Sequence, residues 1–365
     1  MKKLIYIFLT IILFLTTIAA FDMILSNTIY KTINNCYKYE KYYYELKKNC
    51  SGKERFKTSF PIVDVFTDEN GLRVGKDYNG RDKNKKNILI FGDSFTYGVG
   101  IKYEETYVGL IEKTLNNFNV YNYAVGSYSP TVHLFKLNKS IEKNILPNKI
   151  IVFLDFTDVI DEISRWDYDS EKKIPKLKTD EMYLRSKQNL NFKQRNFKLL
   201  TDLSNNINYY SRILRSKLEN SLKKNQNVEI RIKKSIQAQF TYVNKIDLDK
   251  RFWKKGDFEK GLEEIRLSIA EMQKLAQKFS SEFYIVVYPW AETLQYGQKE
   301  FNWSNYAKSL CVIKNCKSID AFKEFNKYKK ENINWNNQLY FVADEHFNTG
   351  GAKLLSEIVI DGLNF

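Results

Sequence analysis

Short apolar runs alternate with helix-like segments along much of this chain, and that alternation limits the possible folds more than any other feature. The run KIIVFLDF (149–156) is almost entirely apolar, as strands buried on both faces of a parallel sheet are. The segment SEFYIVVYP (281–289) repeats the signature. Further strands are predicted at 87–92 and 119–124, and helices at 104–117, 131–144, 261–279 and 348–363. Strands that alternate with helices indicate an α/β fold with a parallel sheet covered on both faces.

Composition excludes several other classes of protein. The chain has 365 residues, enough for one or two domains with a full core. Its 43% of hydrophobic residues argues against general disorder, and 5 prolines with 15 glycines exclude collagen-like architectures. No 20–50-residue repeat is visible, so a solenoid is not expected.

Residues 1–21 predict a membrane anchor or a signal segment. Two lysines precede an uncharged run from Leu4 to Phe21, which reaches the lower limit of about 17–25 residues for a spanning helix. Lysines before such a run favour a cytoplasmic N-terminus with the rest of the chain outside. A cleaved signal peptide is the alternative, but Thr17-Ile18-Ala19 is a poor cleavage site, so we favour the anchor. Both place the body outside the cytoplasm. Residues 22–60, rich in Tyr and Lys, are expected to form a stalk or an N-terminal wrap.

The four cysteines fit an oxidising compartment. Cys36 and Cys50 form one sequence-local pair, and Cys311 and Cys316 form another. We expect these two pairs to be disulfide-bonded, although three connectivities are formally possible. A four-cysteine zinc site is disfavoured because the first pair lacks the short spacing of zinc ligands.

Residues 166–255 interrupt the alternation and carry much of the net charge of +15. We predict a helical basic insertion within a domain that spans 61–365. The segment shows no nucleic-acid-binding motif, and the body is expected outside the cytoplasm, so nucleic acid is not an expected partner. Anionic lipid headgroups or an acidic glycan suit the charge better.

The loop after the first predicted strand reads Gly92-Asp93-Ser94, with Gly98 and Gly100 following. A phosphate-binding loop would need Lys-Ser/Thr after the glycines, and a dinucleotide fingerprint would need a third glycine where Glu104 and Glu105 approach. The remaining interpretation is a serine nucleophile on a strand-to-helix turn, although the α/β-hydrolase pattern G-x-S-x-G fails at Thr96.

A serine nucleophile needs a base, and the chain has two histidines. His346 lies in a loop before the last helix, and Asp344 is placed to hold its ring orientation. His133 lies in a helix-like segment with no carboxylate near it in sequence, and it is predicted to be a half-buried structural residue.

With these residues the sequence resembles the SGNH, or GDSL-like, hydrolase superfamily over about residues 60–365, and within it the cell-surface branch related to alginate O-acetyltransferase proteins. The resemblance implies Ser94 as nucleophile, Asp344 and His346 as its partners, and backbone N–H groups of Ser94 and Gly126 in the oxyanion hole. It also implies a three-layer α/β/α sandwich with a parallel sheet of about five strands, and no cofactor.

One block departs from that family. Where relatives carry Asn after the third strand, this chain reads Leu154-Asp155-Phe156-Thr157, so Thr157 is the candidate third oxyanion donor. The acidic group that surrounds this block is interpreted as helix caps and solvated carboxylates, and no metal site is predicted. That group consists of Asp155, Asp158, Asp161 and Glu162.

These residues predict an extracytoplasmic serine acyl esterase or O-acyltransferase that acts on acetyl or related groups of a surface glycan. A membrane partner that supplies the acyl group is compatible with a transferase. Tyr128, Tyr288 and Trp290 are candidates for stacking on sugar rings, with core packing as the alternative. The alternative function is a catalytically weak or inactive glycan-binding envelope protein with the same fold.

Overall fold

The computed structural model describes residues 2–27, 36–56, 60–169, 171, 174–178, 256–298, 301–341 and 344–363. Within them, five parallel strands form the central sheet in the order β12-β11-β8-β6-β7. The strands are β6 (Lys86–Phe91), β7 (Phe118–Asn122), β8 (Lys149–Leu154), β11 (Glu282–Val287) and β12 (Cys316–Asp320). β8 and all but the first residue of β11 are buried throughout, as their apolar runs predict.

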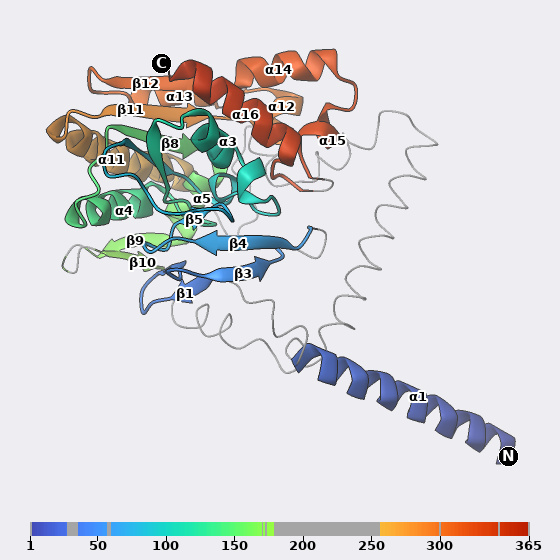
Figure 1. The fold of residues 1–365 in the computed structure, drawn as a ribbon. Coiled ribbons are helices and arrows are strands. Elements are labelled where there is room, and N and C mark those ends of the chain that lie inside the picture. Colours follow the sequence, from blue (N-terminus) through green and yellow to red (C-terminus); the bar gives the residue numbers. More distant parts are fainter. Residues whose placement is uncertain are drawn as a thin grey trace.

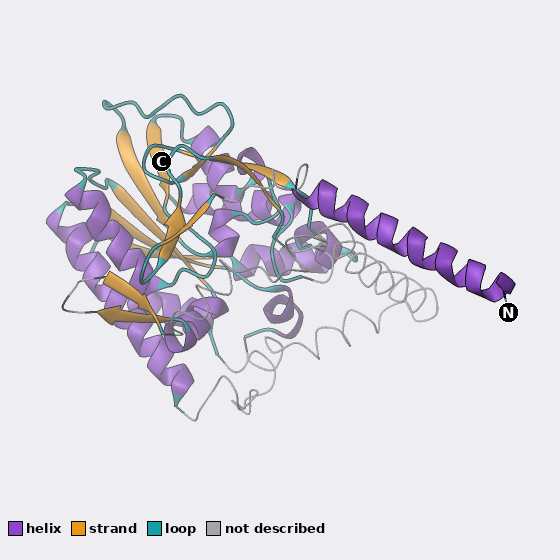
Figure 2. Ribbon diagram, turned by 90° about the horizontal axis from the view of Figure 1, so that it is seen from below, coloured by secondary structure: helices purple, strands orange, loops and turns teal. Residues whose placement is uncertain are grey.

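Helices cover both faces of this sheet, so the predicted three-layer α/β/α fold is confirmed (Figures 1 and 2). Helices α4, α5 and α11 pack together, and α3 packs with α16. The helices of the body are α2 (Ser94–Tyr97), α3 (Tyr107–Thr114), α4 (Pro130–Glu142), α5 (Phe156–Ser164), α11 (Asp257–Lys278), α12 (Ala291–Tyr296), α13 (Trp303–Leu310), α14 (Phe322–Glu331), α15 (Trp335–Leu339) and α16 (Thr349–Gly362), with the 3₁₀ turn η2 (Tyr103–Glu105).

The expected strands and helices form close to the predicted residues, but one strand of the central sheet, β12, was not predicted. β12 lies at the edge of the sheet, and Ile319 is its one buried residue. An edge strand needs no continuous apolar run, which explains why the apolar pattern did not reveal it. The last helix begins as expected, because the Asn348 side chain accepts hydrogen bonds from the N–H groups of Gly350 and Gly351.

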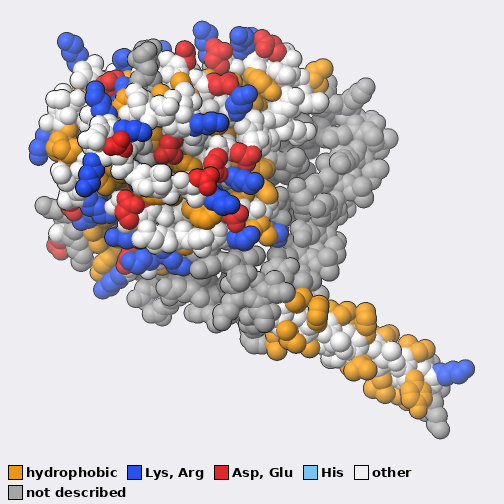
Figure 3. Space-filling view, in the orientation of Figure 1, with side chains coloured by type: hydrophobic (Ala, Val, Ile, Leu, Met, Phe, Trp, Pro, Cys, Tyr) orange, Lys and Arg blue, Asp and Glu red, His pale blue; other side chains and the backbone are white. Residues whose placement is uncertain are grey.

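The N-terminal helix α1 (Lys2–Asn27) extends away from the body (Figure 1). Its segment Ile5–Leu25 is 21 residues long with mean hydropathy 2.3, so it passes Asp22 and the predicted end at Phe21. At 1.5 Å per residue this segment matches a hydrocarbon core of about 30 Å. Hydrophobic side chains cover α1, whereas lysines, arginines and carboxylates are interspersed over the visible face of the body (Figure 3).

Residues 36–56 fold onto the body, and we call them the N-terminal wrap. They contain β1 (Tyr37–Tyr39), β2 (Tyr44–Leu46) and β3 (Ser51–Glu54). β1 and β2 form a hairpin, and β3 joins a three-stranded antiparallel sheet with β4 (Val63–Thr67) and β5 (Arg73–Val74). The buried side chains of Cys36, Tyr44 and Leu46 pack in a second apolar cluster with Tyr97 and Tyr128 of the body. These contacts make the segment a wrap rather than a detached stalk.

Both expected disulfides are present, Cys36–Cys50 and Cys311–Cys316. The first closes the wrap, and the second lies at the start of β12.

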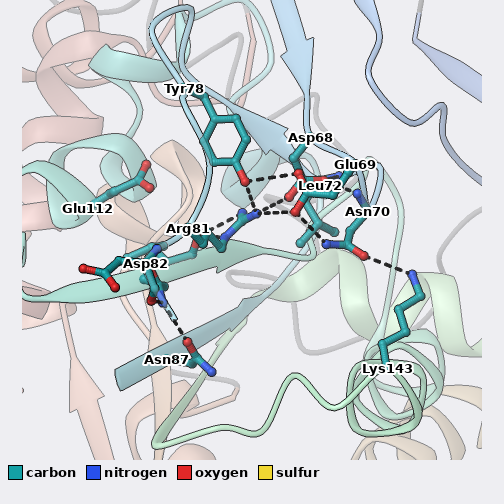
Figure 4. A network of polar contacts seen from close by, with 12 residues as sticks. Asp68, Glu69, Asn70, Leu72, Tyr78, Arg81, Asp82, Asn87, Glu112 and Lys143 are labelled. Atoms are coloured by element: carbon teal, nitrogen blue, oxygen red, sulfur yellow. Dashed lines mark hydrogen bonds and ion pairs between the residues drawn. The ribbon is translucent and has the colours of Figure 1, made fainter. Parts of the chain in front are cut away.

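Polar contacts attach the chain between β4 and β6 to the body (Figure 4). Arg81 forms an ion pair with the buried carboxylate of Asp68, and its guanidinium lies 4.0 Å from the ring centre of Tyr121 in β7. The same guanidinium donates to the Val120 carbonyl. The chain between β4 and β6 is therefore joined to β7 of the sheet by a charged side chain.

The start of the predicted helical insertion forms strands rather than a helix. Strands β9 (Trp166–Asp169) and β10 (Ile174–Leu177) form an antiparallel hairpin, so the first part of 166–255 is not helical. The hairpin is held on the wrap, because the Leu177 N–H donates to the Tyr42 carbonyl. Residues 179–255, which make up most of the predicted insertion, lie outside the described residues.

Candidate active site

Three loops that carry the predicted site residues meet at one edge of the sheet. Ser94 follows β6, Gly126 follows β7, and Thr157 follows β8. Numbered in chain order, the strands lie 2-1-3-4-5 across the sheet. The chain first moves from β6 to one edge and then from β8 to the other, so the order in which strands are added reverses between β6 and β8. Ligands in such sheets bind outside the carboxyl ends of the strands at this switch point. The topology therefore places Ser94 where a substrate would bind.

The turn that carries Ser94 is tightly held. Asp93 caps α2 by accepting a hydrogen bond from the Phe95 N–H at 2.9 Å, and Gly98 ends the helix with φ 83°. The buried guanidinium of Arg73 donates to the carbonyls of Tyr97, Gly98 and Ile101. Carbonyls at and beyond a helix end lack intrahelical donors, and Arg73 supplies donors to these three. Ser94 itself is half-buried.

Ser94, His346 and Asp344 form a hydrogen-bonded chain. Ser94 Oγ lies 2.8 Å from His346 Nε2, and His346 Nδ1 lies 2.6 Å from Asp344 Oδ1. The same aspartate oxygen accepts from the backbone N–H of His346 at 3.1 Å. His346 and Asp344 are 4% and 8% exposed, so water competes weakly for these bonds. The arrangement is that of a nucleophile, a base and a group that orients the base.

Aromatic rings enclose the His346 imidazole. Phe95 stacks on it at 4.6 Å between ring centres, and Phe56 of the wrap meets it edge-on at 5.0 Å. The wrap therefore reaches the catalytic histidine candidate, which the sequence analysis did not anticipate.

His133 is structural, and it is fully buried rather than half-buried as expected. Its Nε2 lies 3.2 Å from the Gly92 carbonyl, just before the nucleophile turn. Burial lowers the pKa of His133 to about 3, so the ring is neutral at neutral pH. A neutral ring can donate its Nε2–H to that carbonyl and support the loop from below.

The Gly126 loop is pinned from two sides. Its carbonyl accepts a hydrogen bond from the Tyr44 hydroxyl at 2.7 Å, and the next carbonyl, of Ser127, accepts from the Trp166 indole at 2.6 Å. Ser127 has φ 59°, a left-handed conformation that is uncommon for serine. A Cβ at Gly126 would lie 3.8 Å from Ser94 Cβ, so the glycine backbone borders the nucleophile.

The Thr157 hydroxyl faces two carboxylates. Thr157 Oγ1 lies 2.5 Å from Asp155 Oδ1 and 2.9 Å from Asp93 Oδ2. Its single proton cannot serve both, whereas a proton on Asp93 completes a chain from Asp93 through Thr157 to Asp155. Burial, and then the charge of Asp155, raise the pKa of Asp93 to about 7, which favours that proton. Thr157 as an oxyanion donor stays a prediction, and its hydroxyl already has acceptors.

This proton predicts a pH-dependent stability. The pKa of Asp93 is about 7 in the folded chain and about 4 in an unfolded one. Protonated Asp93 therefore contributes fully to the free energy of unfolding below pH 4, and this contribution is lost as pH rises through 7. Asp93→Asn keeps a donor toward Thr157 but cannot ionise. We expect urea unfolding to show the wild type losing on the order of 2–4 kcal/mol relative to this variant between pH 4 and 8.

An exposed aspartate provides the control for that measurement. Asp64→Asn, at a side chain that is 54% exposed, should leave the pH profile of the wild type unchanged. Parallel profiles for the wild type and Asp93→Asn would show that Asp93 is ionised throughout.

The acidic group around Thr157 is buried rather than solvated. Asp155 and Asp158 form a capping box at the start of α5, so the prediction of helix caps is correct for these two residues. Asp161 pairs with Arg165 at 2.7 Å, and Glu162 accepts from the Thr131 N–H and hydroxyl. The part of the prediction that placed these carboxylates in solvent is wrong, because each has a partner inside the fold.

The three aromatic residues proposed for sugar stacking are also buried. Tyr288 Oη and Trp290 Nε1 donate to Asp155 Oδ2 at 2.7 and 3.0 Å, and Tyr128 Oη donates to the Tyr44 carbonyl. Core packing, the alternative, is therefore the correct interpretation for all three.

Comparisons with known proteins identify no family and no curated relative: no family model matches the chain, and no curated protein does. Solved structures with a similar chain path include a lipolytic protein of the G-D-S-L family from Veillonella parvula (12% identity, 76% of this chain and 97% of that one, TM-score 0.40). Others are a putative G-D-S-L lipolytic protein from Desulfitobacterium hafniense (13%, 75% and 98%, 0.38) and an acetyl xylan esterase from Geobacillus stearothermophilus (12%, 77% and 95%, 0.38). Similarity of this size assigns no activity to the present chain.

Proposed function

We propose that this protein is an SGNH-type serine esterase or O-acyltransferase that forms an acyl-enzyme on Ser94. The observation that carries the proposal is the chain Ser94 Oγ–His346 Nε2–Asp344 Oδ1, with distances of 2.8 and 2.6 Å on its two links. Serine is a weak nucleophile at neutral pH, and a base within hydrogen-bond reach is what activates it.

Each residue then has a role. His346 Nε2 takes the proton from Ser94 Oγ as the oxygen attacks the acyl carbonyl, and Asp344 stabilises the imidazolium that forms. The backbone N–H groups of Ser94 and Gly126 stabilise the oxyanion. His346 next gives its proton to the leaving alcohol. Water or a sugar hydroxyl then takes the acyl group from Ser94 by the same steps in reverse.

The proposed substrate is an acyl ester, commonly acetyl, of a cell-surface glycan outside the cytoplasm. The two lysines at the start of α1 and the two disulfides support the extracytoplasmic side. The net charge of +15 favours an acidic polymer, and the glycan class follows from the sequence resemblance described above. Membrane attachment through α1 would keep the site near a membrane partner that supplies acyl groups.

Labelling and turnover test this proposal on the full chain in detergent. We expect a fluorophosphonate probe to label the wild type and p-nitrophenyl acetate to be hydrolysed, and both signals to vanish in Ser94→Ala. Ser309→Ala, at an exposed serine on α13, is the matched control and should behave as the wild type. A folded wild type that is neither labelled nor active would instead favour the non-catalytic glycan-binding alternative.

A further inference from the structure

A tyrosine hydroxyl of the wrap lies beside the candidate oxyanion hole. A Cβ built on Gly126 would lie 3.5 Å from Tyr37 Oη and 3.8 Å from Ser94 Cβ, and no other atom of the described residues comes within 4 Å, apart from Gly126 and its two chain neighbours. The Tyr37 hydroxyl and the nucleophile therefore border the same space. The Gly126 N–H donates to that hydroxyl oxygen, because this backbone contact acts to lower the pKa of Tyr37.

The Tyr37 hydroxyl keeps its proton. Burial, and then the negative charge of Glu54, raise the pKa of Tyr37 far above its ordinary range. A protonated phenol can donate a hydrogen bond to a developing negative charge, and it requires no change of protonation state at neutral pH.

The oxyanion hole can take such a donor, because Thr157, which stands where the resembled family carries Asn, makes other hydrogen bonds. The Thr157 hydroxyl lies 2.5 Å from Asp155 Oδ1 and 2.9 Å from Asp93 Oδ2, and in the chain from Asp93 through Thr157 to Asp155 its proton is given to Asp155. Two backbone N–H groups serve the oxyanion, that of Ser94 and that of Gly126, and the Gly126 N–H is shared with Tyr37 Oη.

We propose that the Tyr37 hydroxyl donates the third hydrogen bond to the oxyanion, in place of the Asn side chain of relatives. The inference rests on the proposed function. As Ser94 Oγ bonds to the acyl carbon, the carbonyl π electrons move to oxygen and the Oγ proton moves to His346 Nε2. Tyr37 keeps its proton and hydrogen-bonds to that oxygen. The carbonyl re-forms as the bond to the leaving alcohol breaks, and the alcohol takes the proton from His346.

The wrap holds Tyr37 in this place. Cys36 directly precedes Tyr37 and is bonded to Cys50. The neighbouring strand is joined to the same loop, because Tyr44 Oη donates to the Gly126 carbonyl and Tyr128 Oη donates to the Tyr44 carbonyl. A donor held in advance stabilises the transition state without reorganisation. The Cys36–Cys50 disulfide is therefore expected to support turnover as well as stability.

Steady-state kinetics of the full chain on p-nitrophenyl acetate test the inference. Tyr37→Phe should lower kcat by about 10²–10³-fold with KM within a few-fold, as loss of one oxyanion donor does, and should leave the melting temperature near that of the wild type. Tyr43→Phe is the matched control, because its ring packs edge-on against Phe135, a contact that phenylalanine keeps. Its kcat should be unchanged.

Four outcomes would overturn the inference. Wild-type kcat in Tyr37→Phe, with Ser94→Ala inactive, removes Tyr37 from the oxyanion hole and leaves the proposed function standing. A rise in kcat/KM would make Tyr37 an obstruction rather than a donor. A fall confined to Thr157→Val would return the third donor to Thr157. If Ser94→Ala instead keeps wild-type turnover, the proposed function fails and the inference fails with it.

The disulfide provides an independent arm of the test. The double variant Cys36→Ser with Cys50→Ser should lower kcat, and adding Tyr37→Phe to it should lower kcat by less than in the wild type, because the hydroxyl is already displaced. The pair Cys311→Ser with Cys316→Ser is the control, since that disulfide lies at the opposite, amino end of a sheet strand. A full additional effect of Tyr37→Phe would show that the disulfide does not position this tyrosine.

Discussion

Replacing His346 by alanine should lower turnover of acyl esters by about 10⁴–10⁶-fold while the fold is retained. Nε2 of this ring lies 2.8 Å from Ser94 Oγ. The other histidine of the chain, His133, is fully buried and its Nε2 contacts the Gly92 carbonyl, so it does not replace His346 as the base. Initial rates on p-nitrophenyl acetate and a urea melt, measured on the same preparations, separate activity from folding.

His133→Ala is the informative comparison. This side chain is fully buried, so its removal leaves a cavity and an unsatisfied carbonyl under the nucleophile turn. We expect the free energy of unfolding to fall by about 2–4 kcal/mol, with a far smaller loss of rate than in His346→Ala. The reverse pattern, with rate lost at His133 and stability lost at His346, would contradict the assigned base.

Arg73→Met should lower the free energy of unfolding by about 3–5 kcal/mol, because it leaves buried polar groups without their charged partner. The Arg73 guanidinium binds three carbonyls of the loop after Ser94 and lies 4.6 Å from the centre of the Tyr97 ring. Its positive charge also opposes the effect of burial on the pKa of Glu54, which burial raises. Methionine has similar length but cannot donate. Urea unfolding followed by circular dichroism measures the loss.

Arg266→Met is the control for Arg73. Arg266 is half exposed and pairs with Glu263 on the same helix face, so its removal should change the free energy of unfolding far less than that of Arg73. Arg73→Lys should lie between the two, because one ammonium cannot match the forked donors that three carbonyls require. Equal stabilities for Arg73→Met and Arg266→Met would mean that other groups satisfy these carbonyls.

The sequence by itself was sufficient for features that depend on neighbouring residues. A run such as 149–154 is buried on both sides and must be apolar at every position, so the pattern alone identifies β8. Asp344 and His346 are two residues apart, and a short loop brings their side chains together. The cysteines also paired within short segments. Local geometry settles each of these cases.

Tertiary structure decided what each polar or aromatic side chain contacts. Ser94 and His346 are 252 positions apart, so their bond exists only because β6 and the last loop meet at one edge of the sheet. Tyr288 and Trp290 have the composition of a sugar platform, but the buried Asp155 carboxylate accepts from both. Tyr37 resembles the other tyrosines of the wrap, and no pattern marks it. A tyrosine or an aspartate can face water, a substrate or a buried partner with the same local sequence, and the partner comes from a distant segment that only folding brings near.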